Sequence, residues 1–278
     1  RGHLWRIFVF IAVGMTVYLL FPKLRMYWWE DVALDSSIPY IVSYYFNLLQ
    51  VLIVVFVVFG FIQTQKKRNA MEVMDVYPAG NGERMVGFIW AAFRLVLGLN
   101  IVVLFIAAVF HVLFYQGTMS LWINLFYLLT LTLPTLVFVL GLSLFVMRVV
   151  KVHFLALILL LGYLLLGYFF LSKVLHGVLD PWGRSVPNVF SAHLGHVGLV
   201  EYLIHRGCYL LLGLGFICLS VWWMPRLPSA ARPERGYLFG GMASCLAGVL
   251  LIAGFLGLFA KTESKRERYR EAYLRYAK

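Results

Sequence analysis

Charged residues are the scarcest group in this sequence. Only 13% of the 278 residues are charged, whereas 62% are hydrophobic and the mean hydropathy is +0.86. Soluble domains carry about 25% charged and 45–50% apolar residues, so the composition excludes a water-soluble globular protein. No polar segment is long enough to bury a core of its own. The sequence therefore indicates a polytopic membrane protein.

Cysteines are few, and two nucleotide-binding or hydrolase motifs do not occur. Cys208, Cys218 and Cys245 lie in apolar segments without metal-ligand spacing, which favours a packing role. The sequence holds no Gly-x-x-x-x-Gly-Lys-Ser/Thr motif, so it predicts no phosphate-binding loop in this chain. It holds no His-Glu-x-x-His motif of a zinc hydrolase either. The sequence predicts no catalytic, cofactor or metal site in this chain.

Acidic residues are half as numerous as basic ones, 12 against 24, and the net charge is +12. The basic residues stand mostly beside apolar runs, where they meet anionic lipid, so membrane lipid is an expected partner and nucleic acid is not. Segments on the same side of the membrane as the amino terminus hold 11 Lys and Arg, whereas the loops on the opposite side hold 5. This bias predicts a cytoplasmic amino terminus. Seven spans would also place the tail 261–278 on the opposite side, and its seven Lys and Arg disagree with the bias unless the tail opens a large translocated domain or one span is re-entrant.

Seven apolar segments are long enough to cross a bilayer, which takes about 20 residues per helix. None alternates as a strand does, so we expect an all-α bundle over residues 1–260 and a basic tail, 261–278, that leads to a further domain. The fourth and fifth segments are separated only by residues 148–151 and should form an antiparallel hairpin. The segments are 4–21, 38–62, 85–114, 121–147, 152–172, 207–224 and 237–260.

Five strongly polar side chains lie within these apolar segments. They either line a translocation path or join helices by hydrogen bonds, since side-chain amides bond across helices in lipid. Arg94 stands out because a charge at that depth is costly unless it is paired. The five residues are Asn47, Gln50, Arg94, Asn100 and Asn124.

The polar island 63–84 separates the second and third apolar segments. Residues 69–76 can form a short amphipathic helix, and Pro78 to Gly82 favour a turn after it. Such an island is a place where a soluble partner can bind.

Residues 173–206 form a second polar segment, on the other side. Asp180 to Gly183 predict a turn, and residues 189–206 predict a small helix or helical hairpin that dips into the membrane. His193 and His196 are three residues apart, but no glutamate stands beside the first, so interfacial histidines are favoured over zinc ligands.

The island and its flanking spans resemble the permease halves of type-two ABC exporters, in which this loop carries the coupling helix. The resemblance rests on the pattern formed by Arg68, Glu72, Val73, Met74, Pro78, Gly82 and Arg84. Residues 173–206 look like the outer re-entrant hairpin of the same superfamily. More narrowly, the stretch VPNVFSAHLGHVGLVEYLIHRGCYLLLGLGFICL is similar to bacterial permeases fused to a gluzincin-type aminopeptidase.

The resemblance implies a six-helix permease core with one extra helix, in the bacterial inner membrane. It implies an exporter that moves a lipid-like or peptide-like substrate, driven by a cytosolic ATP-binding subunit and working with a second permease half or as a homodimer. The alternative is a membrane anchor that presents an extracytoplasmic peptidase domain. The residues that would contact the ATPase are Arg68, Met71, Glu72, Val73, Met74, Asp75 and Arg84.

Overall fold

The structure, a computed structural model, describes residues 3–20, 38–65, 80–114, 120–171, 174, 177–183, 190–191, 195–196, 198–224 and 235–276. Regular structure in these residues is helical, apart from one antiparallel ladder in which β1 (Phe190–Ser191) pairs with β2 (Gly195–His196). The all-α prediction is confirmed. The helices are α1 (His3–Leu20), α2 (Ile38–Gln65), α4 (Asn81–Phe114), α5 (Leu121–Tyr127), the π-helix η3 (Leu128–Thr132), α6 (Leu133–Val149), α7 (His153–Phe169), α8 (Leu199–Trp222) and α9 (Arg235–Tyr276).

Five helical segments among the described residues are long and apolar enough to cross a membrane, so the chain is a multi-pass membrane protein. Of the seven predicted spans, the first and fifth form the apolar helices α1 and α7, which have only 18 and 17 residues. At 1.5 Å per residue they are about 27 and 26 Å long, slightly less than the roughly 30 Å of a hydrocarbon core. The five long segments are Pro39–Gln65, Asn81–Leu113, Leu121–Val149, Leu199–Trp222 and Arg235–Ala260.

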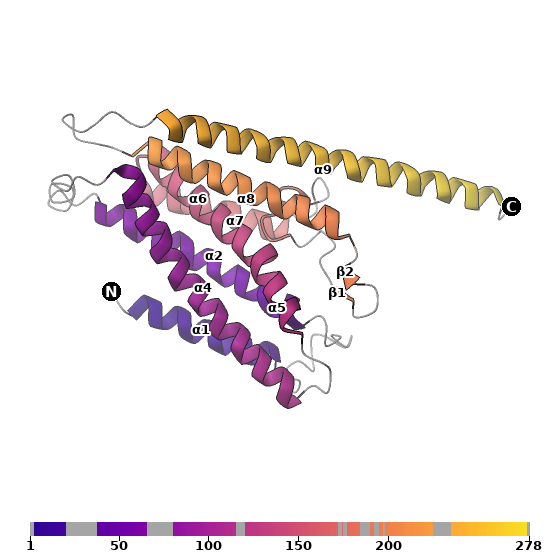
Figure 1. Ribbon diagram of the computed structural model, residues 1–278, viewed down its shortest axis with the longest axis horizontal. Helices are drawn as coiled ribbons and strands as arrows, with labels where there is room; N and C mark the ends of the chain where they lie inside the picture. The colour runs from indigo at the N-terminus through magenta and orange to yellow at the C-terminus, as the bar shows by residue number, and fades with distance from the viewer. Residues whose placement is uncertain are drawn as a thin grey trace.

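Successive spans of the bundle alternate in direction, and α5, η3 and α6 together form one of these spans. Each span therefore begins at one of the two ends of the bundle. We name the near end as the one where α1, α4, α7 and α9 begin, and the far end as the one where α2, α5 and α8 begin. Figure 1 shows the amino terminus at the near end, and the polar part of α9 projecting beyond the far end. The tail therefore leaves the bundle on the side opposite to the amino terminus.

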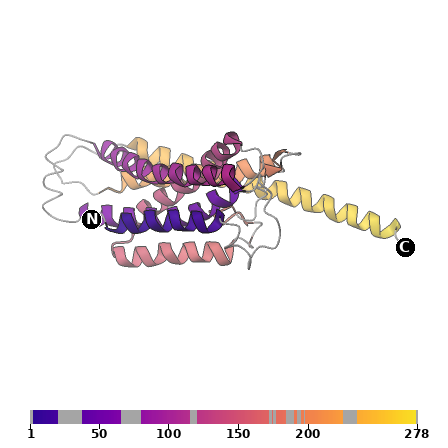
Figure 2. The same ribbon diagram turned by 90° about the horizontal axis from the view of Figure 1, so that it is seen from below.

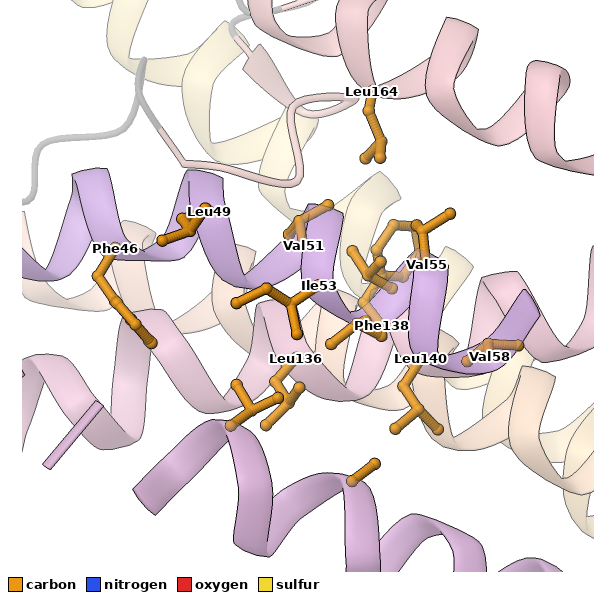
Figure 3. Packing of buried hydrophobic residues seen from close by; sticks show 14 of the residues in the cluster. Phe46, Leu49, Val51, Ile53, Val55, Val58, Leu136, Phe138, Leu140 and Leu164 are labelled. Atoms are coloured by element: carbon orange, nitrogen blue, oxygen red, sulfur yellow. The ribbon is translucent and has the colours of Figure 1, made fainter. Parts of the chain in front are cut away.

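The most buried helices are α2, α6 and α8, and the other helices surround them. α9 packs along α8 at the periphery of the bundle (Figure 1), whereas α7 lies on another outer side, against α2 and α6 (Figure 2). Figure 3 shows the middle of the core, where Ile53 of α2 points toward the helix that carries Leu136 and Leu140 of α6, whereas Val51 and Val55 lie on the opposite side of α2. All five side chains are fully buried.

The contact between α6 and α8 depends on two glycines that face each other. A Cβ atom at Gly141 would overlap the carbonyl oxygen of Gly213, and one at Gly213 would stand 2.6 Å from the backbone nitrogen of Phe138. Lipid gives apolar helices no hydrophobic reason to associate, so close backbone approach between small residues decides which helices pair. The two glycines therefore fix the α6–α8 crossing.

Glycines also join α9 to α8. Added Cβ atoms at Gly241 and Gly248 would stand 2.9 Å from the Cγ atoms of Leu219 and Leu212, respectively. Nearby, the hydroxyl of Ser244 donates a hydrogen bond of 2.7 Å to a backbone carbonyl of α8. Four other glycines of the last span have nothing within 4 Å of an added Cβ and take no part in this contact: Gly236, Gly240, Gly254 and Gly257.

The start of the sixth span differs from the prediction. We expected a small helix or helical hairpin within 189–206 and a separate span from Gly207, because 189–206 is short, polar and interrupted by Gly195 and Gly198. Instead α8 begins at Leu199, directly after Gly198, whose positive φ of 76° turns the chain into the helix. The first eight residues of α8, up to Arg206, therefore belong to a span, and the hairpin before it is the β1–β2 ladder.

The third span begins earlier than predicted, at Asn81 rather than Met85. The carboxylate of Glu83 accepts a hydrogen bond of 3.1 Å from the backbone N–H of Gly80, which satisfies one free donor at the helix start. Arg84 lies in the first turn of α4. The expected amphipathic helix 69–76 lies outside the described residues, as do Arg68, Met71, Glu72, Val73, Met74 and Asp75.

Gly213→Ala is expected to lower the free energy of unfolding by about 1–3 kcal/mol, because the added methyl group meets backbone atoms that cannot turn away. Gly162→Ala is the matched control, since nothing lies within 4 Å of a Cβ there. It should leave stability unchanged or raise it by up to about 1 kcal/mol, the helix preference for alanine. Thermal unfolding in detergent micelles compares the two. Equal melting temperatures would mean that the close crossing is not required.

Candidate functional site

Arg206 is the bulkiest fully buried side chain among the described residues, with an exposed fraction of 2%. It lies seven residues after Leu199, the first residue of α8, and thus inside a membrane span. Charged side chains at membrane depth face the protein interior, pair with internal partners and mark functional sites. Arg206 is therefore the natural starting point for the site.

The guanidinium group of Arg206 binds three backbone carbonyl oxygens. Nε donates to the carbonyl of Thr130 at 3.1 Å, and Nη2 donates to that of Leu131 at 3.0 Å. Nη1 donates to the carbonyl of Pro181 at 3.0 Å, and Nη2 also contacts the hydroxyl of Thr135. One side chain thus joins α8 to the α5–η3–α6 span and to the turn that contains Pro181.

The Thr130 carbonyl is available because of Pro134. In an α-helix the carbonyl of residue 130 would accept the N–H of residue 134, and proline has none. The chain passes through the π-helical turn η3 just before this proline, and the N–H of Leu133 bonds to Leu128. Arg206 supplies the donor that the backbone lacks. The sequence-based expectation of a kink at Pro134 thus corresponds to a π-helical turn.

Two amide side chains of α2 also donate hydrogen bonds to this π-helical turn and to the residues next to it. Asn47 donates from Nδ2 to the hydroxyl of Thr135 at 3.1 Å, and Gln50 donates from Nε2 to the carbonyl of Thr132 at 3.1 Å. Both amide side chains are fully buried. The three consecutive carbonyls 130–132 therefore accept side-chain donors from α8 and α2.

The turn 177–183 inserts into the far end of the bundle. Tyr209 donates from its hydroxyl to the carbonyl of Val178 at 2.7 Å, and Nε2 of His205 lies 3.2 Å from the carbonyl of Gly177. These side chains and Arg206 all belong to α8. The turn is therefore held to one helix face by side-chain contacts to three of its backbone carbonyls.

This turn reaches the middle of the membrane. The hydroxyl of Thr135 lies 3.1 Å from the carbonyl oxygen of Pro181, and Thr135 stands 14 residues from each end of the span Leu121–Val149. Non-helical backbone at this depth is tolerated where protein buries it or where it lines a water-filled cavity. The turn predicted at Asp180–Gly183 is therefore present, and among the described residues of 173–206 it is the non-helical part that reaches this depth.

A glycine lets the turn approach Arg206 so closely. Gly183 has a φ of 67°, which side chains rarely adopt, and an added Cβ would stand 2.9 Å from Nη1 of Arg206. On the other side of the turn, Pro181 and Trp182 lie 3.5 Å from the position of a Cβ at Gly167 of α7. The turn is enclosed between α7 and α8.

Asp180 supplies the opposite charge. Its carboxylate is fully buried, accepts the backbone N–H of Trp182 at 2.9 Å and interacts electrostatically with Arg206. We name Arg206, Asp180, Thr135, Asn47 and Gln50 the Arg206 cluster. It links α2, α6, α8 and the re-entrant turn at mid-depth, and opposite charges within it reduce the cost of burial.

Aromatic side chains adjoin the cluster toward the far end. The hydroxyls of Tyr202 and Thr130 lie 2.9 Å apart, and the Thr130 hydroxyl donates to the carbonyl of Phe126 at 2.7 Å. The ring of His196 lies 5.0 Å from that of Tyr202 and 5.5 Å from that of Phe126. The cluster is therefore separated from the far end by packed rings.

The structure brings two of the five predicted path residues together and separates the other three. Asn47 and Gln50 belong to the Arg206 cluster. Asn124 donates to the carbonyl of Ser120 at 3.1 Å, a local contact at the start of α5.

Arg94 and Asn100 take different positions on α4. Arg94 is on the exposed face of the helix, away from the cluster. Asn100 is fully buried, and within the described part of the chain neither atom of its amide group has a hydrogen-bond partner.

Sequence reasoning missed Arg206 itself because Gly207 was taken as the start of the span. The signal was present: Tyr202, Arg206, Tyr209 and Gly213 follow one another at helical spacing, so they share one face of a helix. Asp180 was noted only as a turn residue, because its approach to Arg206 is not visible in sequence.

Histidines do not form a metal site in the described residues, where no group of three His, Cys, Asp or Glu side chains is placed to hold an ion. His205 is buried against the turn and against the ring of Phe255, 5.5 Å away. His193 lies outside the described residues.

Arg206→Met is expected to lower the free energy of unfolding by about 3–5 kcal/mol, because it leaves three buried carbonyls without their side-chain donor and removes the positive charge that interacts with the buried Asp180. Arg6→Met on the exposed side of α1 is the matched control and should have little effect. Adding Asp180→Asn to Arg206→Met should cost less than the sum of the two single changes, since the unpaired charge is removed. Detergent-based unfolding measures all four. Additive losses would contradict a coupled pair.

No family model matches the chain, and neither a curated protein nor a solved structure matches it. The chain is therefore assigned only as a multi-pass, helical membrane protein, from the length and hydropathy of its helices and from the buried cluster.

Proposed function

We propose that the chain is the membrane-spanning permease subunit of an ATP-driven exporter. It moves a lipid-like or peptide-like substrate by alternating access, and a separate cytosolic subunit binds ATP and magnesium. The observation that carries the proposal is the Arg206 cluster. Transporters place their working sites near the bilayer midplane, where helices are discontinuous and backbone carbonyls are bound by groups other than their own helix.

The bonding of the cluster allows the helices to part without unfolding. The carbonyls of Thr130, Leu131 and Thr132 accept side-chain donors from α8 and α2. Separating α8 from α6 therefore breaks side-chain bonds while the helical backbone bonds persist. A packed interface with two discrete arrangements is what alternating access requires.

The re-entrant turn closes the far end in the described conformation. It fills the space between α7 and α8 and is held by the Tyr209 hydroxyl and by the guanidinium of Arg206. Opening toward the far end would withdraw the turn from both donors. In this proposal the turn is the gate, because its withdrawal opens the path at the far end, and the hydrogen bonds of the Arg206 cluster hold it closed.

The island 63–84 is the proposed site of the ATPase, in a cytoplasm that faces the near end. It follows α2 directly, and α2 also carries Gln50 of the cluster. The part of α2 from Gln50 to Gln65 is about 22 Å long at 1.5 Å per residue. Because this helix is continuous, a displacement of the island by the ATPase would also displace Gln50 in the cluster. A second permease half or a second copy of the chain completes the transporter.

A disulfide that holds the turn against α7 should block the transport cycle. Gly167→Cys with Pro181→Cys introduces two thiols on facing segments, because Cδ of Pro181 lies 3.5 Å from the Cβ position of residue 167. Cys208, Cys218 and Cys245 are replaced by alanine in the same chain. Oxidation is expected to remove most of the vanadate-sensitive ATP hydrolysis of the purified complex, and reduction should restore it. Each single-cysteine variant serves as control. Unchanged hydrolysis with complete cross-linking would refute the gate.

The ATPase partner is tested by purification of the full-length protein from native membranes. An ATP-binding chain should copurify with the wild type and be lost from the double variant Glu72→Arg with Met74→Asp, because Met74→Asp places a charge on the apolar side of the predicted coupling helix and Glu72→Arg reverses a charge beside it. Val86→Asp, at an exposed site of α4 just past the island, is the control. Mass spectrometry that finds no nucleotide-binding chain with the wild type would end the exporter proposal.

The second candidate function is a membrane anchor for an outer domain. It is favoured by α9, which runs without a break from the apolar segment Arg235–Ala260 into the polar tail and packs mainly along α8. A continuous helix of this kind would hold an attached outer domain at a fixed position relative to α8. An anchor would copurify with no ATPase, which separates the two candidates.

A further inference from the structure

One face of α4 is open along most of its length. Gly87, Ala91, Arg94 and Gly98 are all exposed and follow one another at helical spacing, so they form a single stripe. We name these four residues the Arg94 face. Its borders are apolar and also exposed, with Trp90 at 62%.

Arg94 lies within the membrane core. It stands 13 residues after Asn81 and 19 before Leu113, the ends of the span, which is about 20 and 29 Å along the axis. A hydrocarbon core of about 30 Å, placed anywhere along that helix, contains this position. The charge of arginine is permanent, because its guanidinium stays protonated in proteins. An exposed charge at this depth therefore calls for a partner from outside the described bundle.

Small residues around Arg94 leave room for another backbone. Nothing lies within 4 Å of a Cβ added at Gly87 or Gly98. The stripe is therefore shallow, with a charge at its centre and larger side chains at its rim. Transmembrane helices approach each other closely over such stripes.

We propose that the Arg94 face binds a transmembrane helix of a different chain, and that this helix carries an aspartate or glutamate level with Arg94. A second copy of this chain is disfavoured, because a two-fold axis at the stripe would bring Arg94 close to its own copy. Among the described residues of α4 the acidic one is Glu83, at the near end and 11 residues away.

This inference does not depend on the transport proposal. The Arg94 face lies on the outside of α4, whereas the Arg206 cluster lies inside the bundle between α2, α6 and α8. Failure of either proposal leaves the other standing.

The test uses a photo-cross-linking benzoylphenylalanine at Ile101, one turn beyond the face, in the full-length chain in native membranes. We expect a cross-link to one other chain, within an apolar helix that holds Asp or Glu. Arg94→Glu should lower the yield about tenfold or more, since it replaces an attractive charge pair by a repulsive one. Changing the carboxylate of the captured helix to arginine should then restore the yield with Arg94→Glu.

Glycine variants provide the matched control. Gly98→Leu fills the stripe and should lower the yield, whereas Gly254→Leu, at an equally open glycine of α9, should not. A cross-link to lipid alone, a cross-link to a second copy, or a yield that is insensitive to Arg94→Glu would each overturn the proposal. Because Arg94 and Gly98 are exposed, the variants should retain the elution volume of the wild type in size-exclusion chromatography.

Discussion

The structure depends on one arginine that binds backbone carbonyls in the middle of a membrane. Pro134 removes a donor from the α5–η3–α6 span, and the re-entrant turn brings further carbonyls to the same depth. Lipid offers no donors, so these groups must be satisfied within the protein. Arg206 satisfies carbonyls of both segments at once, and the broken helix and the inserted turn can therefore coexist.

The glycine crossing and Arg206 lie on the same face of α8. Arg206 and Gly213 are seven residues apart on that helix, so both lie on nearly the same side of it. Close approach at the glycines brings α8 near enough for Arg206 to reach η3. In lipid, where apolar contact alone gives little reason to associate, shape and hydrogen bonding together select this pairing.

Arg206 and Arg94 both place a charge at membrane depth, where an unpaired charge raises the free energy, and their surroundings differ. Arg206 is enclosed, with Asp180 and carbonyl oxygens around it, whereas Arg94 lies on an open helix face beside small residues. The first holds the fold together from within. Arg94 is instead placed to bind a helix of another chain. The two arginines differ in role because Arg206 lies on the inner side of its helix and Arg94 on the outer side.

The sequence by itself determined the class, the positions of the long helices and the polarity of the island, because hydropathy over 20 residues needs no knowledge of neighbours. It also marked Asn47 and Gln50 as polar groups that need partners. Tertiary structure alone decided that these amides meet η3, that α8 begins before Gly207, and that Asp180 faces Arg206. Such contacts join residues 26 to 88 positions apart. Local pattern cannot encode them, since each depends on how whole helices cross.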